Sequence, residues 1–234
     1  MRCLTGLGDV DSAAPSYFLW DLSRCVKGSE ELTAAFDEGV DGLLERLSSS
    51  ETEEAEEFLS SWDDFLFEFG CRGPNEYEIF SDTWETRPAI ALALLDRIRL
   101  QSDDEDPAGR HKVIAESRIS TINEVREKLA ALGNEELTGT FEASLNAGNI
   151  MVFQERTKTN YIRVVNEIRV VFEELGKRAV LEGSLGDHKH IYMLKDDELE
   201  TFVADRGAMQ STLETRYADY LELQELEPPF FIKD

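Results

Sequence analysis

Residues 58–79 read FLSSWDDFLFEFGCRGPNEYEI, and this stretch decides the fold class. Its first half places large apolar side chains at steps of three and four, which is typical of one face of an α-helix. Gly70, Gly73 and Pro74 then end the helix, because glycine permits positive φ and proline fixes φ at about −65°. The stretch therefore predicts a buried helix followed by a rigid turn that holds Arg72 as a positioned cation.

The same helical spacing recurs along most of the chain. We expect helices over residues 13–26, 30–47, 50–69, 88–100, 109–132, 148–181, 196–204 and 208–226. Ser50 and Glu53 form a capping-box pattern at the start of one of them, and Gly183 is placed as the stop of the longest. Residues 191–194 form either a brief strand or a turn, and Pro228-Pro229 imposes an extended exit. The predicted fold is mainly α, a multi-helix domain with at most a very short strand pair.

The longest expected helix carries an apolar stripe that predicts a core-facing side. The stripe consists of Tyr161, Val164, Val165, Ile168, Val171, Phe172 and Leu175. We expect residues 1–234 to form one helical domain, with a possible sub-boundary in the acidic, proline-containing loop at 101–108.

Charge and cysteine content exclude several classes of protein. The formal charge is −25, from 49 acidic and 24 basic side chains, so phosphate backbones and anionic lipid surfaces are repelled. We therefore expect no nucleic-acid partner and no membrane partner. The three cysteines show no CxxC spacing, which argues against a disulfide framework or zinc site and favours a reducing cytoplasm. No apolar run reaches 18 residues and no signal peptide is evident.

Sequence motifs for catalysis are few. No G-x-S-x-G, Walker or G-x-G-x-x-G motif occurs. His188 and His190 form an H-x-H pair without an evident third ligand, so we expect solvated loop histidines and no metal site. Cys71 lies beside Arg72, which favours the thiolate, but no histidine base is near in sequence. A structural Cys71 is the favoured interpretation.

Two groups of basic residues interrupt the acidic background. One is Arg72, and the other comprises Arg156, Lys158 and Arg163. Arg156 and Arg163 are seven residues apart and share a helical face, whereas Lys158 lies roughly 160° from Arg156 around the axis. These cations could meet a phosphoryl group. The favoured alternative is that they pair with neighbours such as Glu155 and Glu167 on a solvated surface.

The glycine turn and three later segments resemble one family. Residues 69–78, FGCRGPNEYE, followed by TWETRP at 83–88, resemble a segment of the phosphoenolpyruvate-utilising enzymes, which include phosphoenolpyruvate synthases and rifampicin phosphotransferases. Residues 155–178 are similar to the central helix of that family, and IYMLKDDEL at 191–199 is similar to a further segment. Residues 226–230 resemble the passage into the next domain.

The resemblance implies a helical substrate-binding or linker domain between an ATP-binding domain and a swivelling domain whose histidine carries the phosphoryl group. ATP and magnesium are implied for the full enzyme, and no cofactor is implied for this chain. The partners are then a small-molecule acceptor, such as pyruvate or a larger hydroxylated natural product, and those two domains in cis or in trans. We expect the isolated chain to lack kinase activity.

The resemblance also carries over individual residues. An Arg-x-x-x-Lys pair of the family corresponds to Gln154 and Lys158, so Lys158, Arg156 as a substitute arginine, and position 154 are the catalytic candidates. In the turn, Arg72 and Glu76 match, and Cys71 replaces the usual histidine. These three are the substrate-binding candidates. We expect Arg72 and Glu76 either to order the turn by pairing or to line the cleft.

A second class of function stays open. The chain could be a stand-alone, non-catalytic helical module that binds a protein or an apolar ligand, and the changes at positions 71 and 154 fit such a history. The reading frame after Asp234 separates the two: continuation into a glycine-rich histidine domain favours the phosphotransferase.

Overall fold

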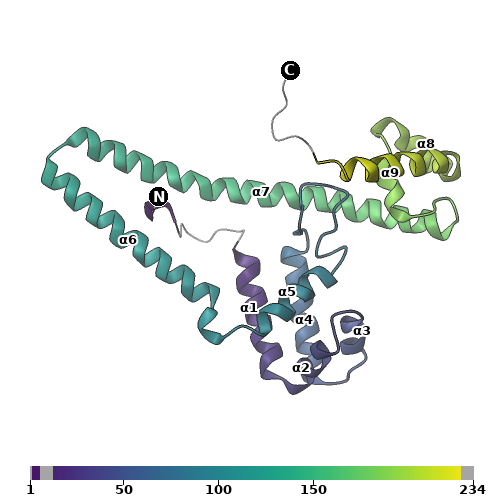
Figure 1. Cartoon of the computed structure of the whole chain (residues 1–234), viewed down its shortest axis with the longest axis horizontal. Coiled ribbons are helices and arrows are strands. Elements are labelled where there is room, and N and C mark those ends of the chain that lie inside the picture. The colour runs from purple at the N-terminus through teal and green to yellow at the C-terminus, as the bar shows by residue number, and fades with distance from the viewer. Residues whose placement is uncertain (1, 6–12, 228–234) are drawn as a thin grey trace. The chain divides into compact units, whose positions relative to one another are not determined.

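The computed structural model describes residues 2–5 and 13–227, with the side chains of Arg2, Asn149, Met151 and Val152 excepted (Figure 1). The chain divides into two compact units. The first unit comprises Met1–Pro74 and Thr83–Arg163, and the second comprises Asn75–Asp82 and Val164–Asp234. Every regular element within the described ranges is a helix, which confirms the mainly α prediction. The predicted exit at Pro228-Pro229 lies outside the described residues.

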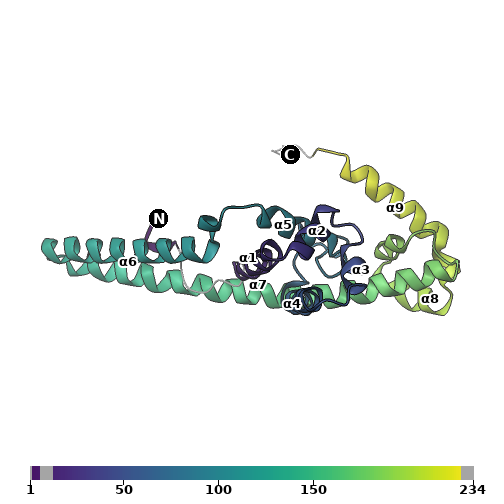
Figure 2. The same cartoon turned by 90° about the horizontal axis from the view of Figure 1, so that it is seen from below.

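The first unit is a small helical bundle extended by two long helices. Its α-helices are α1 (Ala14–Gly28), α2 (Glu30–Asp37), α3 (Leu43–Ser48), α4 (Glu53–Phe69), α5 (Ala89–Arg99), α6 (Pro107–Leu132) and the first part of α7 (Glu135–Leu181). Short 3₁₀ turns occupy η1 (Arg2–Leu4) and η2 (Asp103–Glu105). Gly133 caps the end of α6 in a left-handed conformation, just before α7 begins. Figure 2 shows both helices from a second side. The possible sub-boundary at 101–108 lies inside this unit, and the chain passes between the units at 74/75, 82/83 and 163/164.

The core of the first unit forms around the apolar face of α4, as its spacing predicts. Trp62 is 1% exposed and stacks on Phe58 and Phe65, with ring centroids 6.3 and 5.2 Å apart. Phe65 also stacks on Trp84 at 5.4 Å, beyond the glycine turn. Aromatic packing therefore fixes the turn against the helix that precedes it.

The prediction of one helix over residues 30–47 is wrong, because the structure has two helices there, α2 and α3, joined by a loop. Gly39 and Gly42 have φ values of 103° and 67°, which other residues rarely adopt. Arg46 fixes this loop by donating hydrogen bonds to the carbonyl oxygens of Ala35, Gly39 and Asp41. Two glycines with positive φ therefore override an otherwise continuous helical pattern.

This loop gives a test of backbone strain. We expect Gly39→Ala to lower the free energy of unfolding by about 1–2 kcal/mol, because alanine is strained at positive φ although its Cβ would meet nothing within 4 Å. Gly139→Ala is the matched control, since Gly139 lies in α7 with equally open space. Its expected effect is a stabilisation of roughly 0.5–1 kcal/mol. Urea unfolding of both variants measures the difference, and equal effects would contradict the assigned φ at Gly39.

The predicted capping box at the start of α4 is also wrong. Thr52 is the N-cap, and its side chain accepts a hydrogen bond from the backbone N–H of Ala55. The Ser50 hydroxyl instead donates to Glu31 at 2.6 Å, and Thr52 donates to the same carboxylate at 2.8 Å. These two hydrogen bonds lower the pKa of Glu31. Because Ser50 is bonded to Glu31 of α2, the N-cap of α4 is Thr52, two residues after the predicted position.

The second unit is smaller and packs turns against the end of α7. It contains the last part of α7, η3 (His188–Met193), η4 (Asp196–Glu198), α8 (Leu199–Ala204), η5 (Arg206–Met209) and α9 (Gln210–Gln224). Its buried apolar residues are Ala179, Leu185, Ile191, Phe202 and Leu213. Residues 191–194 therefore adopt the turn alternative, and the possible strand is excluded for them.

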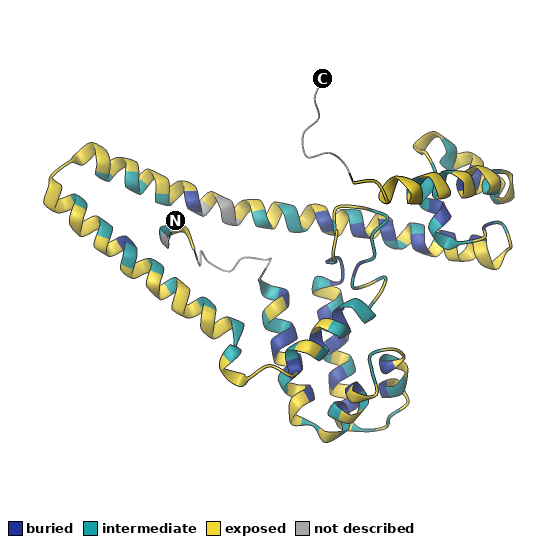
Figure 3. Cartoon of the chain, viewed as in Figure 1, coloured by how far each residue is buried: buried dark blue, intermediate teal, exposed yellow. Residues whose placement is uncertain are grey.

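Helix α7 differs from its prediction in length and in its buried face (Figure 3). It begins at Glu135 rather than at residue 148. Four members of the predicted stripe are 45–63% exposed: Tyr161, Val164, Ile168 and Val171. The buried side instead includes the polar residues Asn166, Arg169 and Glu173. The packed face of α7 therefore contains polar side chains that have hydrogen-bond partners, and much of the predicted apolar stripe lies on the exposed side.

Candidate functional site

A polar pocket in the first unit brings together two of the sequence-predicted site residues, Arg72 and Arg156. Its volume is about 290 Å³. The lining residues are Ala14 from α1, Glu68 and Phe69 from α4, Arg72 from the glycine turn, and Arg156, Thr159, Asn160 and Arg163 from α7. We refer to it as the arginine pocket.

Helical periodicity explains which residues α7 contributes. Arg156 and Arg163 are two turns apart and line the pocket together, as their spacing predicts. Thr159 and Asn160 lie between them on the same face. Lys158 faces another direction and does not line this pocket.

The glycine turn fixes the backbone that carries Arg72. The amide of Arg72 donates to the carbonyl of Phe69 at 2.9 Å, and its own carbonyl accepts from Trp84 at 2.8 Å. Gly70 accepts from Glu85 at 2.9 Å, and a Cβ at Gly70 would lie 2.3 Å from the Leu66 carbonyl oxygen. The turn therefore needs glycine at position 70, and it holds Arg72 at 6% exposure.

The arginine pocket is lined by three arginines and one carboxylate, that of Glu68. Arg163 donates to Glu68 Oε2 at 3.0 Å and to the Glu68 carbonyl at 3.2 Å, so its partner is not Glu167 as the surface-pairing alternative expected. Arg156 makes no ion pair with any described residue. The pocket is thus a local positive site in a chain of formal charge −25, suited to an anion.

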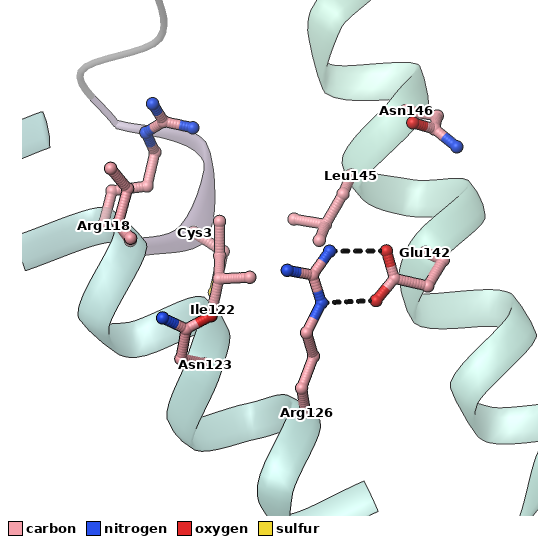
Figure 4. Close-up of a pocket in the computed structure, with 9 residues that line it drawn as sticks. Cys3, Arg118, Ile122, Asn123, Arg126, Glu142, Leu145 and Asn146 are labelled. Carbon is pink, nitrogen blue, oxygen red and sulfur yellow. Dashed lines mark hydrogen bonds and ion pairs between the residues drawn. The ribbon is translucent and has the colours of Figure 1, made fainter.

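A second pocket, in the α6–α7 hairpin, has a volume of about 220 Å³ and also contains arginine (Figure 4). There the Arg126 guanidinium forms two parallel hydrogen bonds to the Glu142 carboxylate, at 2.7 and 2.8 Å. Such a bidentate pair satisfies the fork of the guanidinium. Arg118 also lines this second pocket, and its Nε is buried without a hydrogen-bond partner among the described residues. We prefer the arginine pocket as the anion site because three arginines line it, against two here.

The other predicted site residues lie elsewhere. Gln154 is exposed on α7 and Lys158 is half-buried. Cys71 is buried in the turn and is not part of a disulfide. Glu76 belongs to the second unit, where its carbonyl oxygen accepts a hydrogen bond from Arg169 at 3.2 Å. The roles proposed for Lys158, Gln154, Cys71 and Glu76 stay predictions.

Sequence reasoning missed Arg169, which is fully buried in the second unit. Its guanidinium donates to the carbonyl oxygens of Glu76, Glu78 and Ile79 at 3.0–3.2 Å, and to Asn166 Oδ1 at 2.9 Å. One side chain therefore organises the continuation of the glycine turn. One signal in the sequence could have found it. Arg169 and Glu173 are four residues apart, so they lie on the same face of the longest helix, α7.

Glu173 and Lys189 form a second buried polar cluster in this unit. The Lys189 ammonium lies 2.6 Å from Glu173 and 2.7 Å from Asp82, and the Tyr192 hydroxyl donates to Glu173 at 2.9 Å. Burial lowers the pKa of Lys189, but the hydrogen bonds to Asp82 and Glu173 outweigh it, and the net shift is upward. Burial and the Glu173 carboxylate raise the pKa of Tyr192. The cluster thus keeps its lysine charged and its tyrosine neutral.

The prediction that both histidines are solvated loop residues is wrong for His190. His188 is half-buried and lies 3.2 Å from the Glu173 carboxylate. His190 is buried against Tyr217, with ring centroids 4.8 Å apart, so it is not a solvated loop residue. Among the described residues, no group of three or more histidine, cysteine or acidic side chains could hold a metal. In the same part of the chain, no helix combines the length and apolarity needed to span a membrane.

Comparison with known proteins gives two matches. Residues 1–149 match the family described as "Rifampicin phosphotransferase fourth domain". The chain is also 24% identical over 218 residues to the "Uncharacterized phosphotransferase YvkC" of Bacillus subtilis (strain 168). That alignment covers 92% of this chain and 25% of the relative, so the chain spans about a quarter of the relative's length.

Proposed function

Because the chain belongs to the rifampicin phosphotransferase fourth-domain family, we propose that it is the helical substrate-binding domain of an ATP-dependent phosphotransferase. In this proposal the domain holds a small-molecule acceptor while other domains deliver the phosphoryl group. The acceptor is pyruvate or a larger hydroxylated natural product of the rifampicin type. The arginine pocket is the observation that carries the proposal.

The chemistry of phosphoryl transfer explains why such a pocket is useful. The transferring group carries negative charge on its oxygens, and proteins accelerate the reaction mainly by positioning and by fixed positive charge. Arginine suits this task because its planar fork can donate two parallel hydrogen bonds to a phosphoryl group. Arg156, with Arg72 beside it, is the proposed anion-binding group. Lys158 does not line this pocket, so its proposed contact with the reacting oxygens is a separate prediction, taken from the family resemblance.

The remaining chemistry would come from outside this chain. We assign ATP, magnesium and the phosphohistidine relay to an ATP-binding domain and a swivelling histidine domain of the longer protein. The chain's own residues then bind and orient the acceptor, and hold its anionic group against the arginine pocket. The isolated chain is expected to bind anions without transferring a phosphoryl group.

Phosphate binding tests the arginine pocket directly. We expect inorganic phosphate to bind the 234-residue chain saturably and to shift the amide resonances of Thr159 and Asn160. Arg156→Ala should weaken this binding roughly tenfold, since a hydrogen bond to a charged group contributes about 1.5–3 kcal/mol. A titration followed by NMR measures the affinity.

Arg97→Ala is the matched control, because Arg97 is an exposed arginine on α5 that does not line the arginine pocket. It removes the same charge and should leave the affinity within twofold. An equal loss in both variants would mean that phosphate senses only net charge, and the assignment of the pocket would be wrong.

The second candidate is a non-catalytic binding module. The exposed apolar side chains of Tyr161, Val164, Ile168 and Val171 on α7 favour it, because such a face is suited to a protein partner. As a stand-alone module, this candidate predicts that the chain functions without an ATP-binding domain or a histidine domain and that Arg156→Ala has no effect on partner binding. Phosphoryl transfer that depends on this domain in a longer protein would rule it out.

A further inference from the structure

A cavity in the first unit, separate from the arginine pocket, lies among α1, α2 and α4. Its volume is about 350 Å³. The lining residues are Leu22, Cys25, Gly28, Ser29, Leu32, Glu54, Glu57, Phe58 and Ser61. None of them lines the arginine pocket, so the inference below does not rest on the proposed function.

The floor of this cavity is the hydrophobic core itself. Leu22, Leu32 and Phe58 are 2–3% exposed and belong to the main core cluster. A Cβ at Gly28 would meet nothing within 4 Å, so the wall at the end of α1 is open. Small-molecule sites are typically apolar cavities of roughly 300–1,000 Å³ with few polar groups. This cavity fits the lower end of that range and is too small for a folded partner segment.

Two carboxylates lie at the rim of the cavity, and no basic residue of the lining neutralises their charge. Glu54 and Glu57 are three residues apart on α4, so both carboxylates lie on the same side of the helix. Neither forms an ion pair with a residue that the structure describes, and no basic residue lines the cavity. Lys27, close in sequence, is engaged 2.7 Å from Asp103. A positive charge at the mouth would therefore be attracted by two carboxylates.

We propose that this cavity binds a small apolar molecule that carries one protonated amine. The apolar part fills the space above Leu22, Leu32 and Phe58, and the ammonium group lies between Glu54 and Glu57. Apolar burial supplies most of the affinity, and the carboxylates supply the preference for a cation over a neutral molecule of the same shape.

Cys25 provides a built-in reporter of occupancy. Its thiol is free and exposed, and the residue lines the cavity, whereas Cys3 is free and lies outside it. The probes are 4-phenylbutylamine and its neutral analogue 4-phenylbutanol. The measurement is the rate at which N-ethylmaleimide modifies each cysteine, read by peptide mass spectrometry at increasing probe concentration. The amine should slow modification of Cys25 saturably and leave Cys3 unchanged.

Charge variants separate the contribution of the rim from that of the floor. Glu54→Gln with Glu57→Gln should reduce the affinity for the amine about fivefold and leave that for the alcohol unchanged, consistent with weak exposed ion pairs. Glu53→Gln with Glu56→Gln is the matched control, since both residues are exposed on α4 outside the cavity. It should leave both affinities unchanged. Gly28→Leu should abolish protection by either probe.

Three results would overturn the proposal. Equal protection of Cys25 by the amine and by the alcohol would mean that the carboxylates give no preference for a cation and that the site binds neutral apolar molecules equally well. Equal protection of Cys3 and Cys25 would mean that the probes act on the reagent or on the whole surface. Absence of protection by the amine up to its solubility limit would show that the cavity does not bind this class of ligand.

Discussion

Replacing Arg169 with methionine is expected to destabilise the second unit by about 3 kcal/mol. Arg169 is 0% exposed and donates to three backbone carbonyl oxygens of residues 76–79. Methionine keeps much of the volume but removes every donor, and buried acceptors that lose their partners cost about 1–3 kcal/mol each before the structure relaxes. The loss of one side chain should therefore release the segment that follows the glycine turn.

Hydrogen exchange measures this release at defined positions. The amides of Glu78 and Ser81 donate within the turn, to Asn75 and Glu78, and should exchange much faster in the variant. Arg178→Met is the matched control, because Arg178 lies on the same helix but is exposed and pairs with Glu174, its neighbour one turn away. Its effect should stay below about 0.5 kcal/mol. Unchanged exchange at Glu78 and Ser81 in Arg169→Met would contradict the organising role of Arg169.

Most of the fold could be predicted from the sequence because helices are set by local spacing. The apolar face of α4 and its stop at Gly70 follow directly from residues 58–79. The break between α2 and α3 could not be predicted, since Gly39 and Gly42 are compatible with a helix until Arg46 binds the loop carbonyls. The buried face of α7 was missed because the partners of Arg169 are about 90 residues away in sequence.

The candidate site was partly predictable for the same reason. Arg156 and Arg163 share a face of one helix, so their spacing was sufficient. The approach of Arg72 and Glu68 to that face is a tertiary contact, and no local pattern encodes it. The glycine turn pointed to Arg72 and helical spacing to Arg163, but only the structure shows that both line the same pocket.

The second large effect is expected at Lys158, in the longer protein that we propose contains this domain. Lys158→Ala should lower kcat by roughly 10²–10³-fold, the range found when one group that stabilises transition-state charge is removed. The KM for the acceptor should change less than threefold, because the proposed contact strengthens only as charge develops on the transferring group. The variant should fold normally, since Lys158 lies outside the core clusters.

Arg156→Ala in the same protein provides the contrast. A residue that holds the anionic part of the substrate throughout the reaction should raise KM and leave kcat nearly unchanged. Opposite kinetic signatures for two cations on one helix would separate binding from acceleration. Identical signatures would mean that the two side chains act as a single unit.

Steady-state phosphorylation of the acceptor tests the central claim most directly. The longer protein is supplied with ATP and magnesium, with pyruvate or rifampicin as acceptor, and the phosphorylated product is quantified for wild type, Lys158→Ala and Arg97→Ala. Substrate binding by this domain predicts turnover in wild type and Arg97→Ala and a loss of at least a hundredfold in kcat for Lys158→Ala. Turnover by Lys158→Ala at the wild-type rate, or phosphorylation of neither acceptor by the wild-type protein, would contradict it.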